Sequence, residues 1–245
     1  MNEPAVLVEH VHKRYKDKQA VDDISLRVEP GEVLGILGAN GAGKTTTVEM
    51  IAGLRTPDRG SIAVLGLHPR RDRAALRQVL GVQLQQSYLH GALTVAELVG
   101  LYRTFYPDPR PADELLDLVD LRDQRRTRFE RLSGGQQQRL SIALALAGRP
   151  RLVILDELTT GLDPRARRRM WSAIEELREE TVLLVSHAMD EAERLCDRVA
   201  LLDAGRVIAL DTPAGVVSQA GAANLEDAFV ALTGKDLDLE EEEAA

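Results

Sequence analysis

The sequence has one cysteine, few aromatic residues and no long hydrophobic run. A single cysteine, Cys196, cannot form a disulfide within the chain, which excludes a disulfide-stabilised scaffold and favours a reducing compartment. Aromatic residues make up only 3% of the chain, so aliphatic side chains must fill the core, and Cys196 is expected to pack there. Nowhere do eighteen apolar residues run together, and residues 1–11 lack the apolar stretch of a secretion signal. The chain is therefore not expected to span a membrane by itself.

An excess of positive charge is also absent. The formal net charge is -8, and six acidic residues lie between residues 236 and 243, where there is no basic residue. Without that stretch, 31 basic residues stand against 33 acidic ones, so the body of the chain offers no basic surface for nucleic acid. Residues 235–245 are expected to form a disordered acidic tail. Lysines number five and arginines 26, a bias that we interpret as that of a bacterial genome rich in G and C.

The order of apolar runs predicts an α/β domain with a helical insertion. Apolar runs that alternate with helical patterns are typical of strands that feed helices in a largely parallel sheet. Strands are expected at residues 33–37, 61–65, 80–82, 152–155, 181–185 and 198–202, and a hairpin at 199–209 with its turn at 203–205.

Two helical stretches complete this prediction. One helix is expected from residue 45 to 54, stopping near Gly53, and mostly helical structure from about 94 to 148. The longer stretch starts with a capping-box pattern, Thr94 with Glu97 three residues on. Prolines interrupt it at positions 107, 109 and 111.

The sequence G-x-x-x-x-G-K-[ST] stands between an expected strand and an expected helix. Glycines let the backbone curl so that its N–H groups face phosphate oxygens, and the helix start adds the positive end of its dipole. Lys44 is expected to reach the β- and γ-phosphates, Thr45 to ligate a magnesium ion and Thr46 to add a hydroxyl group. The alternative, a glycine-rich loop without a ligand, is disfavoured by this strand-and-helix context. The residues of this phosphate loop are Gly38, Ala39, Asn40, Gly41, Ala42, Gly43, Lys44 and Thr45.

Two carboxylates follow another apolar run. Residues 152–155 lead directly into Asp156 and Glu157, and buried strands do not ordinarily end in adjacent acids unless a cation or a proton transfer uses them. Asp156 is expected to organise the magnesium ion, and Glu157 to act on the attacking water as a general base or by orienting it. Alone, such a pair fits a surface loop as well; the phosphate loop earlier in the chain favours the catalytic interpretation.

A histidine stands just past the apolar run 181–185. His187 is expected at the edge where parallel sheets place their ligands, within reach of a γ-phosphate or an attacking water. A lone histidine is more often structural, and spacing alone leaves both interpretations open.

One segment carries the resemblance to a known family. Leu132-Ser133-Gly134-Gly135-Gln136 predicts a helix capped by Ser133, whose two glycines expose backbone N–H groups as a second potential anion site. The string resembles the signature motif of ATP-binding cassette (ABC) proteins and lies, as in that family, between the phosphate loop and the two acids. The resemblance implies that Ser133, Gly134, Gly135 and Gln136 contact ATP.

Further ABC elements occur in order, and the resemblance covers roughly residues 5–232. Tyr15 resembles the aromatic residue that stacks on adenine, with a packed tyrosine as the alternative. Gln85 resembles the glutamine that ligates magnesium and leads into the helical subdomain, although Gln83 and Gln86 leave its position open by a residue or two.

The same resemblance gives the remaining site residues. Asp163 falls in Gly161-Leu162-Asp163, which resembles the loop that crosses to the partner protomer. His187 resembles the switch histidine, which makes Glu157, His187 and Gln85 the expected catalytic residues. Leu158 stands where the family mostly has proline, and it is expected to loosen the turn that places Glu157.

The ABC resemblance implies a fold and a domain organisation. The expected fold is α/β, a P-loop NTPase core with a mixed, mostly parallel sheet, an N-terminal antiparallel β subdomain and an inserted helical subdomain at about 85–148. Residues 1–234 are expected to form this ABC ATP-binding domain. ATP would lie between the phosphate loop of one chain and Ser133-Gly134-Gly135 of the other in a head-to-tail homodimer.

Within the family, the chain resembles the branch that exports drugs, polysaccharides or lipids through separate permease chains. The motifs that carry this resemblance are residues 40–47, 81–85, 159–164 and 225–234, the last of which an amphipathic terminal helix describes equally well. The expected partners are integral membrane permease subunits and a second copy, not nucleic acid. The expected location is the cytoplasmic face of the membrane.

Two other functions compete with transport. A soluble ABC protein that acts on ribosomes or DNA would ordinarily carry two fused cassettes or long coiled coils. Here Lys44 and Ser133 are 89 residues apart, with no sustained heptads between them. A GTPase or small-molecule kinase would leave the signature segment unexplained, and no Asn-Lys-x-Asp motif is present.

Overall fold

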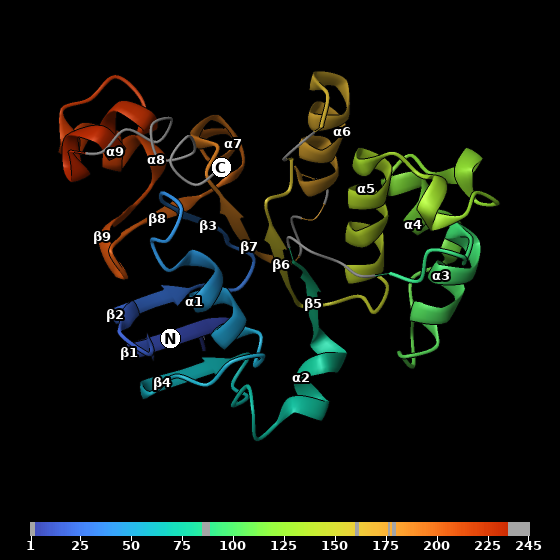
Figure 1. Cartoon of the computed structure of the whole chain (residues 1–245), viewed down its shortest axis with the longest axis horizontal. Coiled ribbons are helices and arrows are strands. Elements are labelled where there is room, and N and C mark those ends of the chain that lie inside the picture. The colour runs from blue at the N-terminus through green and yellow to red at the C-terminus, as the bar shows by residue number, and fades with distance from the viewer. Residues whose placement is uncertain (1–2, 85–88, 160–161, 176, 178–179, 235–245) are drawn as a thin grey trace.

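The computed structural model describes residues 3–84, 89–159, 162–175, 177 and 180–234. Gln85, Gly161 and the acidic tail therefore lie outside the described residues. Two β-sheets and the helices between and around them make up this part of the chain (Figure 1).

A three-stranded antiparallel sheet opens the chain. Its order is β2-β1-β4, and its strands are β1 (Val6–Tyr15), β2 (Lys18–Val28) and β4 (Arg59–Val64). One face of each strand is buried while the other is polar, the alternation expected of a sheet with one solvated face. The antiparallel subdomain implied by the family resemblance is therefore present.

The second sheet has six strands and is parallel except at one edge. Its order is β5-β6-β7-β3-β8-β9, and only the β8–β9 pair is antiparallel. Its central strands are buried over almost every residue, which explains their continuous apolar runs. The strands are β3 (Val33–Leu37), β5 (Leu80–Gln83), β6 (Leu152–Asp156), β7 (Thr181–Ser186), β8 (Arg198–Asp203) and β9 (Arg206–Asp211). This agrees with the expected mixed, mostly parallel sheet and with the expected hairpin.

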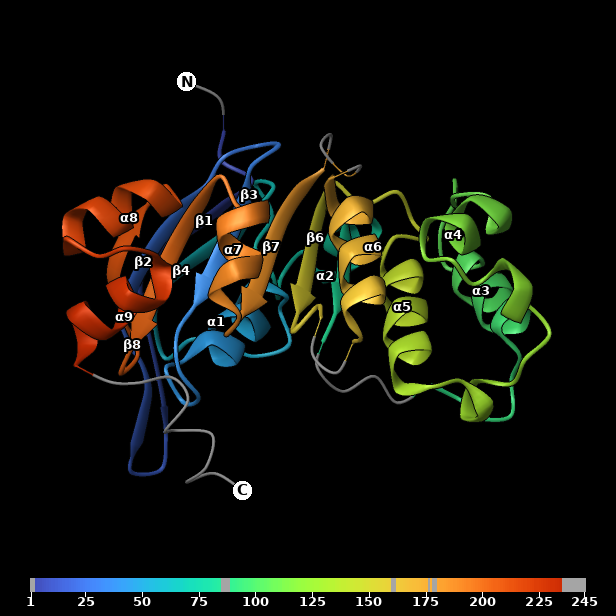
Figure 2. The same cartoon turned by 90° about the horizontal axis from the view of Figure 1, so that it is seen from above.

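The helices are disposed around and beyond the six-stranded sheet. Figures 1 and 2 both place α3, α4 and α5 at one end of the molecule, beyond β5 and β6, and α8 and α9 at the other end. The bounds are α1 (Lys44–Ile51), α2 (Arg73–Val79), α3 (Val95–Arg103), α4 (Ala112–Leu118), α5 (Gly134–Ala145), α6 (Pro164–Glu175), α7 (Met189–Leu195), α8 (Pro213–Ala220) and α9 (Leu225–Thr233), with two short 3-10 turns at Arg122–Gln124 and Phe129–Arg131.

Local sequence signals set several helix ends. The capping box of Thr94 and Glu97 starts α3, and the proline-rich stretch separates α3 from α4, as the sequence predicts. Helix α1 ends at Ile51, earlier than the expected residue 54. The chain turns at Gly53, which has a φ of 71°. Only glycine suits this position, because a side chain there would lie 2.5 Å from the carbonyl oxygen of Pro69.

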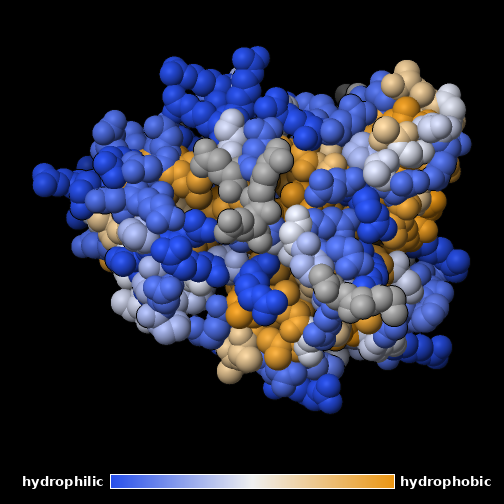
Figure 3. Space-filling model, turned by 180° about the vertical axis from the view of Figure 1, so that it is seen from behind, coloured by the Kyte–Doolittle hydropathy of each residue, from blue (hydrophilic) through white to orange (hydrophobic). Residues whose placement is uncertain are grey.

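Two hydrophobic clusters stabilise the domain. One surrounds α1, where Val48, Met50 and Ile51 pack with apolar residues of both sheets. In the other, residues of helices α3 through α9 pack against the opposite side of the six-stranded sheet. This cluster contains Cys196, which is buried as expected. Within the part of the chain that the structure describes, no helix combines the length and apolar character needed to cross a bilayer. On the face shown in Figure 3, the hydrophobic patches in view are separated by hydrophilic residues.

Candidate active site

The phosphate loop joins β3 to α1, and it is packed tightly against two other strands. At Gly38, with φ 147°, an added Cβ would lie 2.2 Å from the carbonyl oxygen of Leu202 on β8. At Gly43, with φ 102°, it would lie 2.5 Å from the carbonyl oxygen of Ala20 on β2. No other residue type fits at either position, so the loop's curvature is fixed by its glycines.

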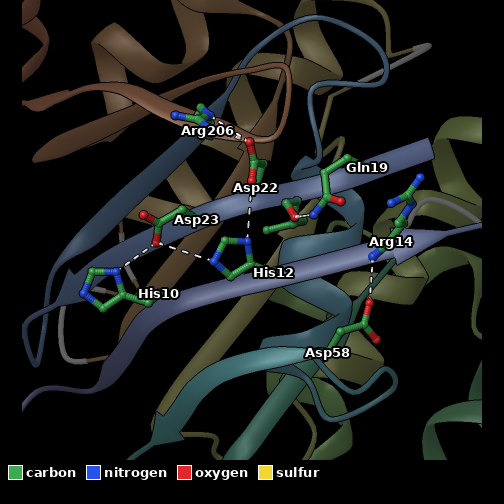
Figure 4. A network of polar contacts seen from close by, with 9 residues as sticks. His10, His12, Arg14, Gln19, Asp22, Asp23, Asp58 and Arg206 are labelled. Atoms are coloured by element: carbon green, nitrogen blue, oxygen red, sulfur yellow. Dashed lines mark hydrogen bonds and ion pairs between the residues drawn. The ribbon is translucent and has the colours of Figure 1, made fainter. Parts of the chain in front are cut away.

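The turn between β8 and β9 fastens this loop to β2. Gly205 donates its backbone N–H to the carbonyl oxygen of Ala42 (3.0 Å), and its own carbonyl accepts from the N–H of Asp22 (2.7 Å). Arg206 donates through Nε and Nη2 to Oδ2 of Asp22, at 2.9 and 2.7 Å (Figure 4). This guanidinium lowers the pKa of Asp22, and His12 lies 3.5 Å from the other carboxylate oxygen. The loop is therefore braced from both sides.

The start of α1 follows this loop directly. Lys44 is only 7% exposed, and its Nζ donates to the carbonyl oxygens of Gly38 (2.7 Å) and Ala39 (3.0 Å). No side chain of the described residues caps the helix at Gly43. Thr45 is exposed and Thr46 half-buried at the first turn. The uncapped N–H groups, Lys44 and the two hydroxyls are the donors that a polyphosphate requires.

Asp156 ends β6 as a buried carboxyl group. It is 2% exposed, and its Oδ2 is buried with no hydrogen-bond partner among the described residues. Burial and the neighbouring Glu157 carboxylate raise the pKa of Asp156 to about 6, and Lys44 opposes that rise. An unpartnered buried carboxylate oxygen fits a bound divalent cation, because magnesium is typically held by one or two carboxylates together with substrate phosphates. The residues present therefore fit a magnesium ion.

Glu157 and His187 follow neighbouring parallel strands. Glu157 has a φ of 54°; its N–H donates to the carbonyl of Val185 (2.8 Å), and its carbonyl accepts from Nε2 of Gln138 (3.2 Å). Its Oε1 lies 3.8 Å from Nδ1 of His187. Leu158 is completely buried. The two backbone hydrogen bonds of Glu157 hold the turn after β6. That Leu158 loosens this turn stays a prediction.

The sheet order brings most of the predicted residues together. Strands β6, β7 and β3 are adjacent and parallel, so their carboxyl ends meet at one edge. The phosphate loop, Asp156, Glu157 and His187 all follow these strand ends. One chain thus gathers a phosphate site, a cation site and a carboxylate with a histidine beside it.

The signature segment lies apart from this edge. Ser133 caps α5: its Oγ accepts from the N–H of Gln136 (3.3 Å), while Oε1 of Gln136 accepts from the N–H of Ser133 (2.9 Å). The C-terminal end of α5 packs against β5, where Ala145 borders Gly81, and its second turn meets the segment after β6, where Gln138 donates to the carbonyl of Glu157. In Figures 1 and 2, α5 lies apart from α1. Gly134 is exposed, and a Cβ at Gly135 would lie 2.8 Å from Leu162. The structure does not bring Ser133 to the phosphate loop of its own chain.

Tyr15 and Asp163 occupy surface positions. Tyr15 ends β1 half-buried, with the guanidinium of Arg55 at 5.3 Å and Nζ of Lys13 at 5.6 Å from the ring centroid. Asp163 is exposed, and its Oδ1 accepts from the N–H groups of Arg165 and Ala166, both at 2.9 Å, at the start of α6. These hydrogen bonds lower the pKa of Asp163.

The structure adds residues to the site that the sequence left open or did not assign. Gln83, buried at the end of β5, accepts from the N–H of Asp156 through its Oε1 (3.1 Å). Gln138 reaches the carbonyl of Glu157, and Ser186 and Glu191 meet beside His187. Two of these left a signal in the sequence: Gln83 as an alternative to Gln85, and Glu191 as a charged residue on the apolar side of a helix.

Comparison with known proteins decides the family. A sequence profile described as ABC transporter matches residues 21–160, more than half of the chain. The Nod factor export ATP-binding protein I of Rhizobium etli is 41% identical over 216 residues, which cover 85% of this chain and 68% of that protein. The protein of the same name from Burkholderia pseudomallei is 43% identical over 213 residues, with 84% and 70% covered. The chain belongs to the ABC transporter family.

Solved structures of ABC proteins share the fold. An ATP-binding subunit of an ABC transporter superimposes with a TM-score of 0.85 at 29% identity, covering 94% of this chain and 99% of that one. A dimeric ATP-binding cassette in a post-hydrolysis state with ADP and Pi gives 0.78 at 27% identity, with 84% and 98% covered. The chain is an ATP-binding subunit and an ATPase of this family, and the expected P-loop NTPase fold is confirmed. ABC ATPase domains dimerise and work with membrane permease subunits.

Proposed function

We propose that this chain powers export of a drug-like, lipid or polysaccharide substrate through a separate permease at the cytoplasmic face of a bacterial membrane. The observation that carries the proposal is the assembly of phosphate loop, Asp156, Glu157 and His187 at one sheet edge, in a chain whose relatives are named as export ATPases. A ribosome- or DNA-directed function finds less support, because the body of the chain is nearly neutral.

The phosphate loop and Asp156 would hold MgATP. The N–H groups at the start of α1 and the ammonium of Lys44 neutralise the phosphates once Lys44 exchanges its two carbonyl partners for phosphate oxygens. Thr45 and Asp156 are the residues that would hold magnesium, with Gln85 as the further ligand implied by the family. The ion supplies positive charge to the transferring phosphoryl group. Tyr15 would stack on the adenine.

Glu157 and His187 would carry out hydrolysis. Glu157 accepts a proton from the attacking water or orients that water. Hydrogen bonds from its N–H to Val185 and from Gln138 to its carbonyl hold its backbone in place. His187, 3.8 Å from Glu157, donates to the γ-phosphate or the water. Phosphoryl transfer is mostly positioning and charge neutralisation, which these fixed groups supply.

A second copy would complete each site. Among the described residues, the side chains of Ser133 and Gln136 hydrogen-bond only to each other's backbone, and α5 lies apart from α1, so these residues and Gly134 and Gly135 would meet a nucleotide held by another chain. A head-to-tail homodimer satisfies this requirement, with Asp163 in the loop between the protomers. Hydrolysis would then weaken the interface that ATP holds together.

The helical subdomain, residues 85–148, would pass this motion to the permease. Leu101 and Phe105 at the end of α3 are 44% and 57% exposed, the largest apolar exposure in that subdomain among the described residues. Such side chains suit contact with the apolar residues of a membrane partner. We propose the domain division accordingly, with residues 1–234 as the ATP-binding domain.

The test is detergent extraction of native host membranes followed by affinity capture of the tagged chain, with and without ATP. An integral membrane protein recovered in stoichiometric amount supports the transporter assignment and identifies the permease. Recovery of ribosomes or nucleic acid without a membrane protein contradicts it. The double variant Leu101→Asp/Phe105→Asp is expected to lose the membrane protein while retaining ATPase activity, whereas Ile208→Asp, at another exposed apolar residue, is the matched control.

A further inference from the structure

A buried carboxylate beside His187 has no place in the mechanism above. Among the described residues, the buried carboxylates are Glu32, Asp156 and Glu191, and Glu191 is the least exposed at 1%. Glu191 lies in the first turn of α7. Its Oε2 accepts from Oγ of Ser186 (2.8 Å), and its Oε1 accepts from Nε1 of Trp171 (3.1 Å).

The first turn of α7 favours an acidic residue, but packing does not require that its carboxylate be buried here. Both of its side-chain donors are neutral groups, and burying a charge without a cationic partner is costly even when it is hydrogen-bonded. A well-packed apolar residue at the same position is generally as stable or more so. The buried carboxylate is therefore better explained by what its two hydrogen bonds hold in place.

One of these two bonds holds the backbone around His187, and the other leads to α6. Ser186 precedes His187 as the last residue of β7, and its Oγ also accepts from the N–H of Ala188 (3.0 Å). The hydroxyl of Ser186 thus bridges the residue after His187 and the carboxylate of Glu191. The other end of the network is Trp171, on α6, whose ring also stacks beneath the guanidinium of Arg194 at 5.0 Å.

We propose that Glu191 is a positioning residue that holds His187 in register with Glu157 for ATP hydrolysis. The proposal rests on the role proposed above for His187. Glu191 touches no substrate and acts through Ser186 and the backbone of residues 186–188. Its bond to Trp171 ties this turn to α6, the helix that Asp163 starts.

The experiment measures ATPase kinetics of Glu191→Ala in wild-type and His187→Ala backgrounds. We expect Glu191→Ala alone to lower kcat at least tenfold while KM for ATP and the affinity for a fluorescent ATP analogue stay within about twofold, because the phosphate loop is untouched. In the His187→Ala background the same change should lower the residual rate less than about twofold, since the residue through which Glu191 acts is gone. Equal fold losses in the two backgrounds would overturn the proposal.

Graded variants separate positioning from folding. Glu191→Gln keeps one acceptor and is expected to fall between wild type and Glu191→Ala, and Trp171→Phe, which removes one donor, to lower kcat by less than Glu191→Ala. Ser186→Ala removes only the hydroxyl and replaces Glu191→Ala in the kinetic test if Glu191→Ala does not fold. A folded Ser186→Ala with wild-type kcat would overturn the proposal. The matched control is Glu32→Ala, a buried carboxylate paired with Arg198 (3.2 Å), which should lower the melting temperature and leave kcat within about twofold.

The failure of the proposed function looks different. If His187→Ala retains wild-type kcat, the role of His187 and the positioning proposal both fall. If His187→Ala has no detectable activity, NMR replaces the kinetic comparison. The imidazole resonance of His187 is assigned by its absence in His187→Ala and is then compared between wild type, Glu191→Ala and Glu32→Ala. It should broaden or shift in Glu191→Ala and not in Glu32→Ala, and an unchanged resonance would overturn the positioning role alone.

Discussion

Helices α1 and α5 both begin at glycine-containing motifs that are proposed to bind ATP, yet their N-termini are built in opposite ways. Helix α1 starts at Gly43, in the left-handed region, with no side-chain cap from any described residue. Helix α5 starts at Ser133, which forms a reciprocal capping box with Gln136. The first N-terminus keeps its N–H groups for an anion, whereas the second satisfies two of its own donors.

The difference fits the proposed dimer, in which ATP bound to α1 of one chain meets the start of α5 of the other. The loop before α1 is braced by β2 and by the turn at Gly205, so it is shaped within one chain before ATP arrives. The start of α5 has exposed Ser133 and Gly134, and nothing lies within 4 Å of a Cβ added at Gly134. A self-capped, open N-terminus suits a ligand presented by another molecule, because the helix must be stable while that ligand is absent.

The sharpest contrast is expected between variants that add one methyl group at each N-terminus. Gly43→Ala places a side chain 2.5 Å from the carbonyl of Ala20 in a left-handed conformation, a strain of about 1–3 kcal/mol before any clash. We expect the affinity for ATP to fall by about a hundredfold or more. Gly134→Ala is the matched control and should leave affinity within about twofold. Titration with a fluorescent ATP analogue measures both, and similar losses in the two variants would contradict the comparison.

Glu157→Gln separates binding from hydrolysis at the first N-terminus. Loss of the general base should lower kcat by about 10²–10⁴-fold, while ATP affinity stays within about twofold because glutamine keeps the size and one acceptor oxygen of Glu157. Steady-state phosphate release and nucleotide titration give the two quantities. Undiminished turnover would remove Glu157 from the mechanism.

The pH dependence of folding stability tests how much the buried carboxylate of Asp156 destabilises the protein without nucleotide. The pKa of Asp156, about 6, exceeds the ordinary value, so between about pH 4 and 6 the folded protein binds more protons than the unfolded chain and becomes less stable as pH rises. Asp156→Asn cannot ionise. Without nucleotide it should therefore be more stable than wild type by up to about 3 kcal/mol at pH 8, with the difference gone below about pH 4.

Urea unfolding at several pH values measures this difference. The variant should also lose the stabilisation that magnesium adds to ATP-bound wild type, since it lacks the ligand charge. A wild type as stable as Asp156→Asn at pH 8 would show that the carboxylate is not strained.

The smallest effect is expected at the cap of α5. Ser133→Ala removes the capping hydroxyl and should cost about 1 kcal/mol, or about 2–4 °C in melting temperature without nucleotide. Ser133→Asp keeps a good cap and should retain the stability, yet it places a negative charge where ATP is expected and should lower kcat. Calorimetry with ATPase assays distinguishes the two, and an equally active Ser133→Asp would argue against a nucleotide at this N-terminus.

Local signals explain why the site was largely predictable. The phosphate loop, the end of β6 and the capping box of α5 depend on residues close in sequence, so their residue types and spacing carry the information. The antiparallel sheet was implied only by the family resemblance, because irregularities in β1 after Val8 and Lys13 interrupt the alternation by which a half-buried strand is recognised.

Contacts between distant residues could not be predicted in the same way. Gln83 reaches Asp156 across 73 positions, Arg206 reaches Asp22 across 184, and Glu191 joins Trp171 across 20. Each depends on strand order and helix packing, which no local pattern specifies. The approach of Glu157 to His187 likewise follows from the pairing of β6 with β7.

The most direct test of the account is sedimentation of Glu157→Gln and Glu157→Gln/Gly134→Asp with ATP. An aspartate at Gly134 meets no steric obstacle and favours the helix start, so any effect comes from repulsion of phosphate. We predict that both variants bind ATP with equal affinity, that Glu157→Gln dimerises with ATP, and that the double variant stays monomeric. Loss of ATP binding itself in the double variant would mean that the two helix N-termini of one chain share a nucleotide, which contradicts the account.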